Sequence, residues 1–228
     1  MDHAFLFLIA GAVAFIGSHF VLSHPLRAPL VRILGEQGFM GAYTVVSFAT
    51  LGWTIWAFRA VGPGAMPLWD GTGTVPWGIA SGLTLIGLTL LLGSLHGNPA
   101  LPQMSDAKIT AARASGVFAV TRHPMMWGIA IWAMAHVIVA PTPRVLVLMA
   151  AMIALALVGA RLQDRKKAAT LGTSWVDWSA RTHYWPQIAA LGGIRPTLWA
   201  VAVLVWLAAT YGHIHAAHVY AGVWRWVM

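Results

Sequence analysis

Six apolar stretches, each close to the length needed to cross a lipid bilayer, constrain the fold of this chain more than any other feature. A transmembrane helix needs about 20 consecutive, mostly apolar residues, because the hydrocarbon core of a bilayer is about 30 Å thick. The stretches are residues 4–24, 38–60, 76–95, 122–140, 144–160 and 194–218. Charged residues make up only 9% of the chain, whereas a soluble domain carries about 25%. The sequence therefore predicts an all-α polytopic membrane protein, a single bundle of about six transmembrane helices that spans residues 1–228.

The residue types present limit the chemistry of any site. The chain has no cysteine, which excludes disulfides, thiolate metal sites and thiol catalysis. A metal ion or a haem would therefore be held by histidine, methionine, tyrosine or a carboxylate. The net charge of +8 is better explained by membrane orientation than by nucleic-acid binding, and no nucleic-acid partner is predicted. The first apolar stretch lacks the flanks of a signal peptide and is expected to remain as a helix.

The distribution of basic residues predicts the orientation in the membrane, because lysine and arginine collect on the cytoplasmic side. With six spans, most basic residues fall on one side: Arg27, Arg32, Lys108, Arg113, Arg122, Arg161, Arg165, Lys166, Lys167, Arg181 and Arg195. Only three fall on the other side: Arg59, Arg144 and Arg225. An even number of spans places both termini on the same side. The N-terminus and the C-terminus are therefore both expected outside the cytoplasm.

The one sizeable polar segment, residues 161–193, is expected on the cytoplasmic side. Its pattern favours a juxtamembrane amphipathic helix, with a basic cluster at the lipid headgroups. Trp175, Trp178 and Trp185 are expected at the membrane interface, where tryptophan is enriched. If residues 161–193 contributed to a functional site, they would not be only a membrane-surface helix.

Ten histidines against six aspartates and glutamates are an unusual balance. His213, His215 and His218 lie near the outer end of the last span and are expected to form an interfacial cluster. His123 is followed by a proline that suits the first turn of a helix, so it is expected at the cytoplasmic rim. His136 is 13 residues further along the same span, a rise of about 20 Å, and the two cannot bind the same iron.

His19 and His136 are the two histidines placed to act together from different spans. An imidazole inside a span must hydrogen-bond a neighbouring helix or bind a metal. His19 follows Gly17 and Ser18, small residues that favour a close helix approach. Measured from Arg27 and Arg122 as markers of the cytoplasmic interface, His19 lies about 12 Å deep and His136 about 21 Å deep. Two such histidines can be axial ligands of one haem, although hydrogen-bonded histidines are the more common alternative and remain open.

Three stretches carry a family resemblance: "HFVLSHPLRAPLVRILGEQGFMGAYTVVSFATLGWTIWAF" (19–58), "GVFAVTRHPMMWGIAIWAMAH" (116–136) and "DRKKAATLGTSWVDWSARTHYWPQIA" (164–189). Together, in this order, they resemble the NnrU family. Its members are bacterial inner-membrane proteins associated with denitrification and nitric-oxide metabolism. The family is related to the cis-ζ-carotene isomerase of plants and cyanobacteria. The resemblance thus implies a multi-pass protein of the bacterial inner membrane, so that the termini, which the charge distribution places outside the cytoplasm, would be periplasmic.

The resemblance also implies a cofactor. The isomerase is a haem b protein with two histidine ligands, and these positions correspond to His19 and His136 of this sequence. Arg122 and His123 would then line the cytoplasmic mouth of the haem site. If the protein is an enzyme, the iron would carry out redox-gated, isomerase-like chemistry on a hydrophobic small molecule or on nitric oxide.

The resemblance also bears on the residues that would bind the haem propionates and on the reaction. Arg27 or Arg32 would pair with the haem propionates, because arginine binds carboxylates well. The carotenoid reaction itself is not transferred: in "RTHYWP" (181–186) Thr182 and Pro186 match the isomerase pattern, but His183 and Tyr184 do not.

Two other functions stay open. "SGVFAVTRHPMMWG" (115–128) also resembles membrane methyltransferases of isoprenylcysteine and phospholipids, which hold S-adenosylmethionine at the cytoplasmic face. That cationic cofactor needs carboxylates, and in the later motif Asp164 stands among several basic residues. The third interpretation is a non-catalytic factor that assists assembly of, or haem delivery to, a membrane oxidoreductase.

Overall fold

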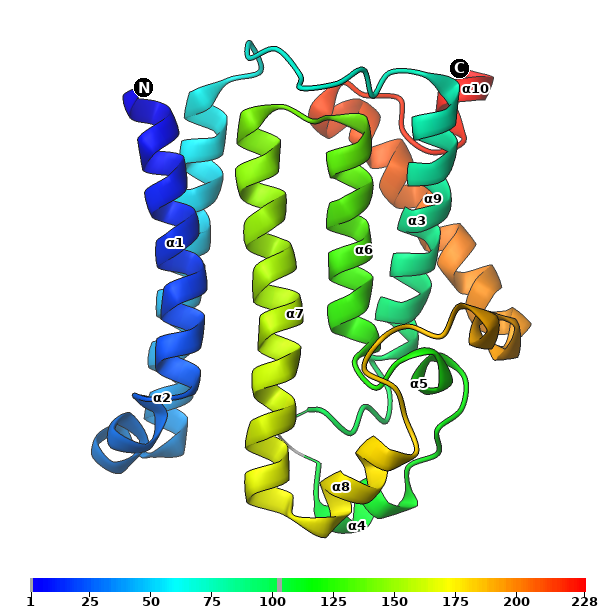
Figure 1. The fold of residues 1–228 in the computed structure, drawn as a ribbon. Coiled ribbons are helices and arrows are strands. Elements are labelled where there is room, and N and C mark those ends of the chain that lie inside the picture. The colour runs from blue at the N-terminus through cyan, green and yellow to red at the C-terminus, as the bar shows by residue number, and fades with distance from the viewer. Residues whose placement is uncertain (1, 102–103) are drawn as a thin grey trace. The chain divides into compact units, whose positions relative to one another are not determined.

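The computed structural model describes residues 2–101 and 104–228. Six long helices account for the six predicted spans (Figure 1): α1 (His3–Ser23), α2 (Arg27–Val61), α3 (Thr74–Gly93), α6 (Pro124–Val139), α7 (Pro143–Leu171) and α9 (Pro196–Ala217). Five of them are long and apolar enough to cross a membrane, and α6 is an apolar helix of 16 residues. The prediction of an all-α polytopic membrane protein is confirmed.

The helix ends follow local sequence signals. Asp2 caps α1, because its side chain accepts a hydrogen bond from the Ala4 N–H at 3.2 Å. Three helices begin on a proline, namely α6, α7 and α9 at Pro124, Pro143 and Pro196. Proline suits this position because its fixed φ is helical and the missing N–H has no helical partner there.

The chain divides into two compact units. Unit 1 contains the residues up to Asp70 together with Ala140–Leu155, and unit 2 contains Gly71–Val139 with Ala156–Met228. Helix α7 contributes its first part to unit 1 and its second part to unit 2. Each unit is described by itself below.

Unit 1 is built around the packing of α1 against α2. The buried residues of α1 recur at helical spacing and form one stripe: Leu8, Gly11, Ala12 and Phe15. Gly11 faces Thr54 of α2, where an added Cβ would stand 3.2 Å from the Thr54 Cα. Helix α2 breaks at Gly35, whose φ of 70° is in the region that favours glycine. The residues between the first two predicted spans, 25–37, were expected to be a loop. In the structure the helix begins at Arg27, before the break.

Unit 2 is built on the packing of α3 against α6, and α9 also contacts α3 (Figure 1). Gly87 and Gly128 let the backbones of α3 and α6 touch. A Cβ at Gly128 would stand 2.5 Å from the Gly87 carbonyl oxygen, and a Cβ at Gly87 would stand 2.7 Å from the Gly128 oxygen. Small residues of this kind are typical where membrane helices approach closely.

This contact gives a testable prediction. Gly128→Ala is expected to lower the unfolding free energy by about 1–3 kcal/mol, because the methyl group forces two backbones apart. Gly82→Ala in α3 is the matched control, since within residues 2–101 and 104–228 no atom outside its own stretch of helix lies within 4 Å of an added Cβ. Thermal unfolding in detergent measures both variants. Equal melting temperatures for the two would mean that the α3–α6 contact does not stabilise the unit.

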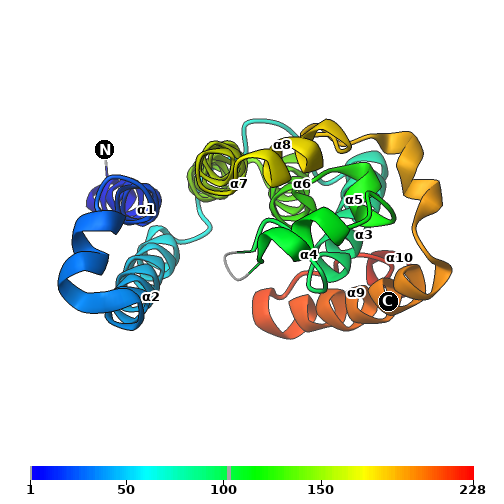
Figure 2. The same ribbon diagram turned by 90° about the horizontal axis from the view of Figure 1, so that it is seen from below.

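Short elements gather at the end of unit 2 where α6 begins (Figures 1 and 2). They are α4 (Asp106–Ala111), α5 (Val117–Val120), α8 (Thr173–Ala180) and the 3₁₀ helix η1 (Ile188–Gly193), while α10 (Trp224–Val227) closes the chain elsewhere. The buried Lys167 ammonium donates to the Pro99 and Leu101 carbonyls at 3.2 and 2.7 Å. Two loops that the charge distribution assigns to one side of the membrane, 96–122 and 161–195, therefore meet.

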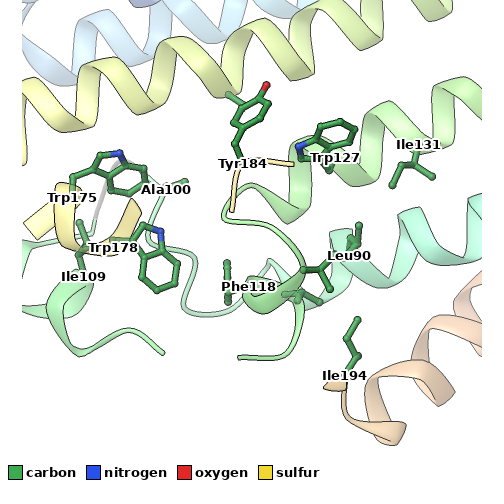
Figure 3. Close-up of a cluster of buried hydrophobic side chains, with 13 residues drawn as sticks. Leu90, Ala100, Ile109, Phe118, Trp127, Ile131, Trp175, Trp178, Tyr184 and Ile194 are labelled. Atoms are coloured by element: carbon green, nitrogen blue, oxygen red, sulfur yellow. The ribbon is translucent and has the colours of Figure 1, made fainter. Parts of the chain in front are cut away.

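Side chains of these short elements form part of the hydrophobic core of unit 2 (Figure 3). Trp175 and Trp178 of α8 are almost completely buried, and they pack with Ile109 of α4 and Phe118 of α5. The prediction that Trp175 and Trp178 lie at the lipid interface is wrong for both residues. Trp185, by contrast, is 59% exposed. Segment 161–193 is not one amphipathic helix, because it contains the end of α7, a turn at Gly172, α8 and η1.

Candidate functional site

Three charged side chains meet at the start of α6 in unit 2. The guanidinium of Arg122 donates two hydrogen bonds to Asp164 Oδ2, from Nε at 2.9 Å and from Nη2 at 2.8 Å. His123 Nε2 lies 2.7 Å from Asp164 Oδ1. Because an ionised carboxylate only accepts, Nε2 carries the proton and donates it. We call Arg122, His123 and Asp164 the ion-paired cluster.

Backbone contacts hold the cluster in place. The Arg122 N–H donates to the His183 carbonyl at 2.8 Å, and the Gln187 N–H donates to the Val120 carbonyl at 2.8 Å. The Thr121 hydroxyl donates to the Tyr184 carbonyl at 2.7 Å. The residues before α6 are thus fastened to the stretch between α8 and η1. This pairing fixes the direction in which Arg122 and His123 leave the backbone.

Aromatic side chains cover the cluster. Tyr184 stands edge-on to His123, with ring centres 5.9 Å apart, and its hydroxyl donates to the Leu157 carbonyl at 2.7 Å. The Arg161 guanidinium lies 4.1 Å from the centre of the Tyr184 ring. The side chain of His123 is only 1% exposed, and those of Arg122 and Asp164 are each 16% exposed. Such cover strengthens the ion pairs, since water screens them poorly.

Asp164 lies in the charged part of α7, beyond the apolar residues 143–160. Burial by itself raises the pKa of this carboxyl group. The hydrogen bonds and charges of His123 and Arg122 outweigh burial and hold the pKa of Asp164 below its usual range. Asp164 is therefore ionised at neutral pH and is already paired with two partners of this chain. It is not free to bind the ammonium group of S-adenosylmethionine, as the methyltransferase alternative requires.

Neither His19 nor His136 belongs to the ion-paired cluster. His19 lies in α1 of unit 1, and its Nδ1 is 2.8 Å from the Phe15 carbonyl oxygen. His136 lies in the last turn of α6 in unit 2, and its Nδ1 is 2.9 Å from the Trp132 carbonyl oxygen. The sequence predicted that His136 hydrogen-bonds a neighbouring helix or binds a metal, and the acceptor of its Nδ1 lies in the same helix. Since a carbonyl only accepts, Nδ1 of each ring donates, and in the neutral form of the ring Nε2 is then the nitrogen with the lone pair.

His19 also lines a pocket of about 260 Å³ within unit 1. Its walls are mainly aromatic and aliphatic and come from α1 and α2: Phe15, Tyr43, Phe48 and Leu51, with the hydroxyl-bearing Thr44 and Ser47. The Tyr43 ring stands edge-on to His19, with ring centres 5.5 Å apart. Gly17 is not a point of close approach, because no atom of the described chain lies within 4 Å of an added Cβ there.

The remaining predicted site residues lie at the surface of unit 1. Arg27 forms an ion pair with Glu36, whose Oε2 is 3.0 Å from Nη2. This pair spans the break at Gly35. Arg32 is exposed. Both arginines follow α1 closely in the chain, on the side predicted to be cytoplasmic.

Sequence reasoning missed the pairing of Asp164 with Arg122 and His123. The partners are about 40 residues apart, and several basic residues stand nearer to Asp164 in the sequence. Adjacent arginine and histidine before Pro124 were a usable signal, but nothing in the sequence indicates which acid they bind.

The long apolar helices define a polytopic α-helical membrane protein. A family model described as NnrU protein matches residues 7–221, nearly the whole chain, and the chain therefore belongs to the NnrU family. No curated protein and no solved structure matches it.

Proposed function

We propose that this NnrU-family protein binds one haem b within the bacterial inner membrane, with His136 and His19 as the axial ligands of the iron, and acts in nitric-oxide metabolism. The observation that carries the proposal is the hydrogen bond that Nδ1 of each imidazole ring forms. In both, Nδ1 donates to the carbonyl four residues earlier, at 2.8 Å in His19 and 2.9 Å in His136.

This hydrogen bond suits a metal ligand. A histidine that binds a metal through one ring nitrogen almost always donates its other ring N–H to a carbonyl or carboxylate. The bond fixes the neutral tautomer, orients the ring and increases the basicity of Nε2. His123 differs from this pattern, because its Nε2 is engaged by Asp164 at 2.7 Å. It is therefore a less suitable ligand than His19 or His136.

The residues around His19 have the apolar character that the face of a porphyrin requires. A porphyrin is a planar apolar group with two carboxylates at one edge, and the pocket beside His19 has aromatic and aliphatic walls. Arg27 and Arg32 remain the residues proposed to pair with the propionates, for which Arg27 would exchange its exposed partner Glu36. Arg122 and His123 would line the cytoplasmic mouth of the site through the ion-paired cluster.

A bound haem supplies one-electron chemistry and a coordination site for small ligands, and the protein sets access and potential. The contributions of this chain are to hold iron through Nε2 of its histidines, to orient the rings by the Nδ1 hydrogen bonds and to exclude water with apolar walls. A hydrophobic small molecule or nitric oxide is the proposed substrate class. Both termini are proposed to lie in the periplasm.

His19→Ala tests the second ligand. We expect this variant to change the electron paramagnetic resonance signal of the ferric protein, because the ligand opposite His136 is removed. The full chain purified in detergent is compared with His3→Ala, which changes an exposed histidine at the start of the same helix. If His19→Ala and His3→Ala give the wild-type signal alike, His19 is not a ligand.

A further inference from the structure

Two exposed arginines of α7 have no acidic partner. Arg161 and Arg165 are four residues apart and therefore share one face of the helix. Asp164 is next to Arg165 in the chain, but its carboxylate is engaged in the ion-paired cluster. No carboxylate in the described part of the chain forms an ion pair with either guanidinium. Both positive charges are therefore available to an anion from outside the chain.

The Arg161 side chain is held in place by aromatic rings. Its guanidinium carbon lies 4.1 Å from the centre of the Tyr184 ring and 5.9 Å from the centre of the Trp185 ring. Tyr184 is fixed in turn, because its hydroxyl donates to the Leu157 carbonyl of α7 at 2.7 Å. A guanidinium that lies over a ring keeps the N–H groups in its plane for bidentate binding of a phosphate or a carboxylate. Since the side chain is already ordered, less entropy is lost when an anion binds.

The same face of α7 is apolar just below the arginines. Val158 is exposed and lies three residues before Arg161, so it is on this face and about 4.5 Å further along the helix axis. The apolar part of α7, residues 143–160, ends immediately before Arg161. Trp185, beside the Arg161 guanidinium, is also exposed. Two positive charges at the edge of an apolar surface match a phospholipid, whose phosphate lies at the edge of its acyl chains.

We propose that Arg161 and Arg165 bind the phosphate of one anionic phospholipid on the side of the membrane predicted to be cytoplasmic. Val158 and Trp185 would contact its acyl chains. Clusters of basic residues beside membrane helices are typical binding sites for anionic headgroups. A zwitterionic lipid fits less well, because its own ammonium group is repelled by the arginines. All four residues belong to unit 2, and the proposal makes no use of the haem site.

Native mass spectrometry of the full chain in detergent, titrated with phosphatidylglycerol, tests the proposal. Arg161→Gln and Arg165→Gln are each expected to weaken phosphatidylglycerol binding about fivefold, the usual effect of one cation near an anionic lipid. Because Arg165 is exposed, its variant is expected to remain folded. Phosphatidylcholine should bind the wild-type protein more weakly than phosphatidylglycerol does, and its binding should not change in the variants.

Lys108→Gln is the matched control, because Lys108 is an exposed cation of α4 on the same predicted side of the membrane. This variant should bind phosphatidylglycerol as the wild type does. If it weakens binding as much as Arg165→Gln, the lipid responds only to total charge and the proposal is overturned. Equal binding of phosphatidylglycerol and phosphatidylcholine by the wild type would also overturn it. Displacement of the lipid by an equal concentration of inorganic phosphate would instead identify a soluble anion as the ligand.

Discussion

Replacement of His136 by alanine is expected to reduce the haem content of the purified protein by at least about tenfold. His136 is one of the two proposed ligands of the iron, so its loss would leave His19 as the remaining protein ligand. Changes to the residues around a metal ligand already cost about 10–100-fold in affinity, and loss of the ligand itself should cost no less. Haem content is measured per protein chain by the pyridine haemochrome spectrum.

His183→Ala is the control for this prediction. His183 is exposed, lies in the segment predicted to be cytoplasmic, and contributes only its backbone carbonyl to the contacts around Arg122. This variant should retain the wild-type haem content. If His136→Ala retains it as well, the iron is held elsewhere, and His24 is the next candidate. Its Nδ1 is 3.3 Å from the Phe20 carbonyl oxygen, and its Nε2 is buried without a partner in the described chain.

The second large effect is expected at Asp164. Asp164→Ala should lower the unfolding free energy by about 3–5 kcal/mol, because removal of one partner leaves buried charges uncompensated. Arg122 would lose both hydrogen bonds to Oδ2, and His123 would lose its acceptor at 2.7 Å. The destabilisation should be confined to unit 2, where all three residues lie. Denaturant unfolding in detergent, followed by tryptophan fluorescence, measures the change.

Asp177→Ala supplies the comparison, since Asp177 is an exposed aspartate of the neighbouring helix α8. Its replacement should change stability by less than about 0.5 kcal/mol, as is usual for surface positions. The account of the ion-paired cluster is contradicted if Asp164→Ala and Asp177→Ala unfold at the same denaturant concentration.

The six spans could be predicted from the sequence because the bilayer imposes its thickness on every crossing helix. Pro124 also indicated where one of the helices, α6, begins. The short helices α4, α5 and α8 were not predicted, because the bilayer does not set their length. They lie outside the apolar spans, and long-range packing determines their structure.

Trp175 and Trp178 illustrate this limit. Tryptophan beside a membrane span is enriched at the lipid interface, and the basic residues of segment 161–193 strengthened that expectation. The structure instead buries both side chains against Ile109 and Phe118. Composition indicates that a segment lies near the membrane, but it does not indicate which side chains turn towards a protein core.

Some features of the candidate histidines could also be predicted from the sequence, and others could not. The positions of His19 and His136 within apolar spans could be read from the sequence, and the Nδ1 hydrogen bond to the carbonyl four residues earlier is open to any helical histidine. The proximity of His213 to His136 could not be predicted. It depends on how α6 and α9 are placed in unit 2, and the two residues are far apart in the sequence.

The central claim is that one iron is held between two imidazoles, of which His136 provides one. The electron paramagnetic resonance spectrum of the ferric wild-type protein tests this claim most directly, because it reports the number and type of axial ligands. The account predicts a low-spin bis-imidazole signal from about one haem per chain. A colourless protein, or haem with only a high-spin signal, would contradict it.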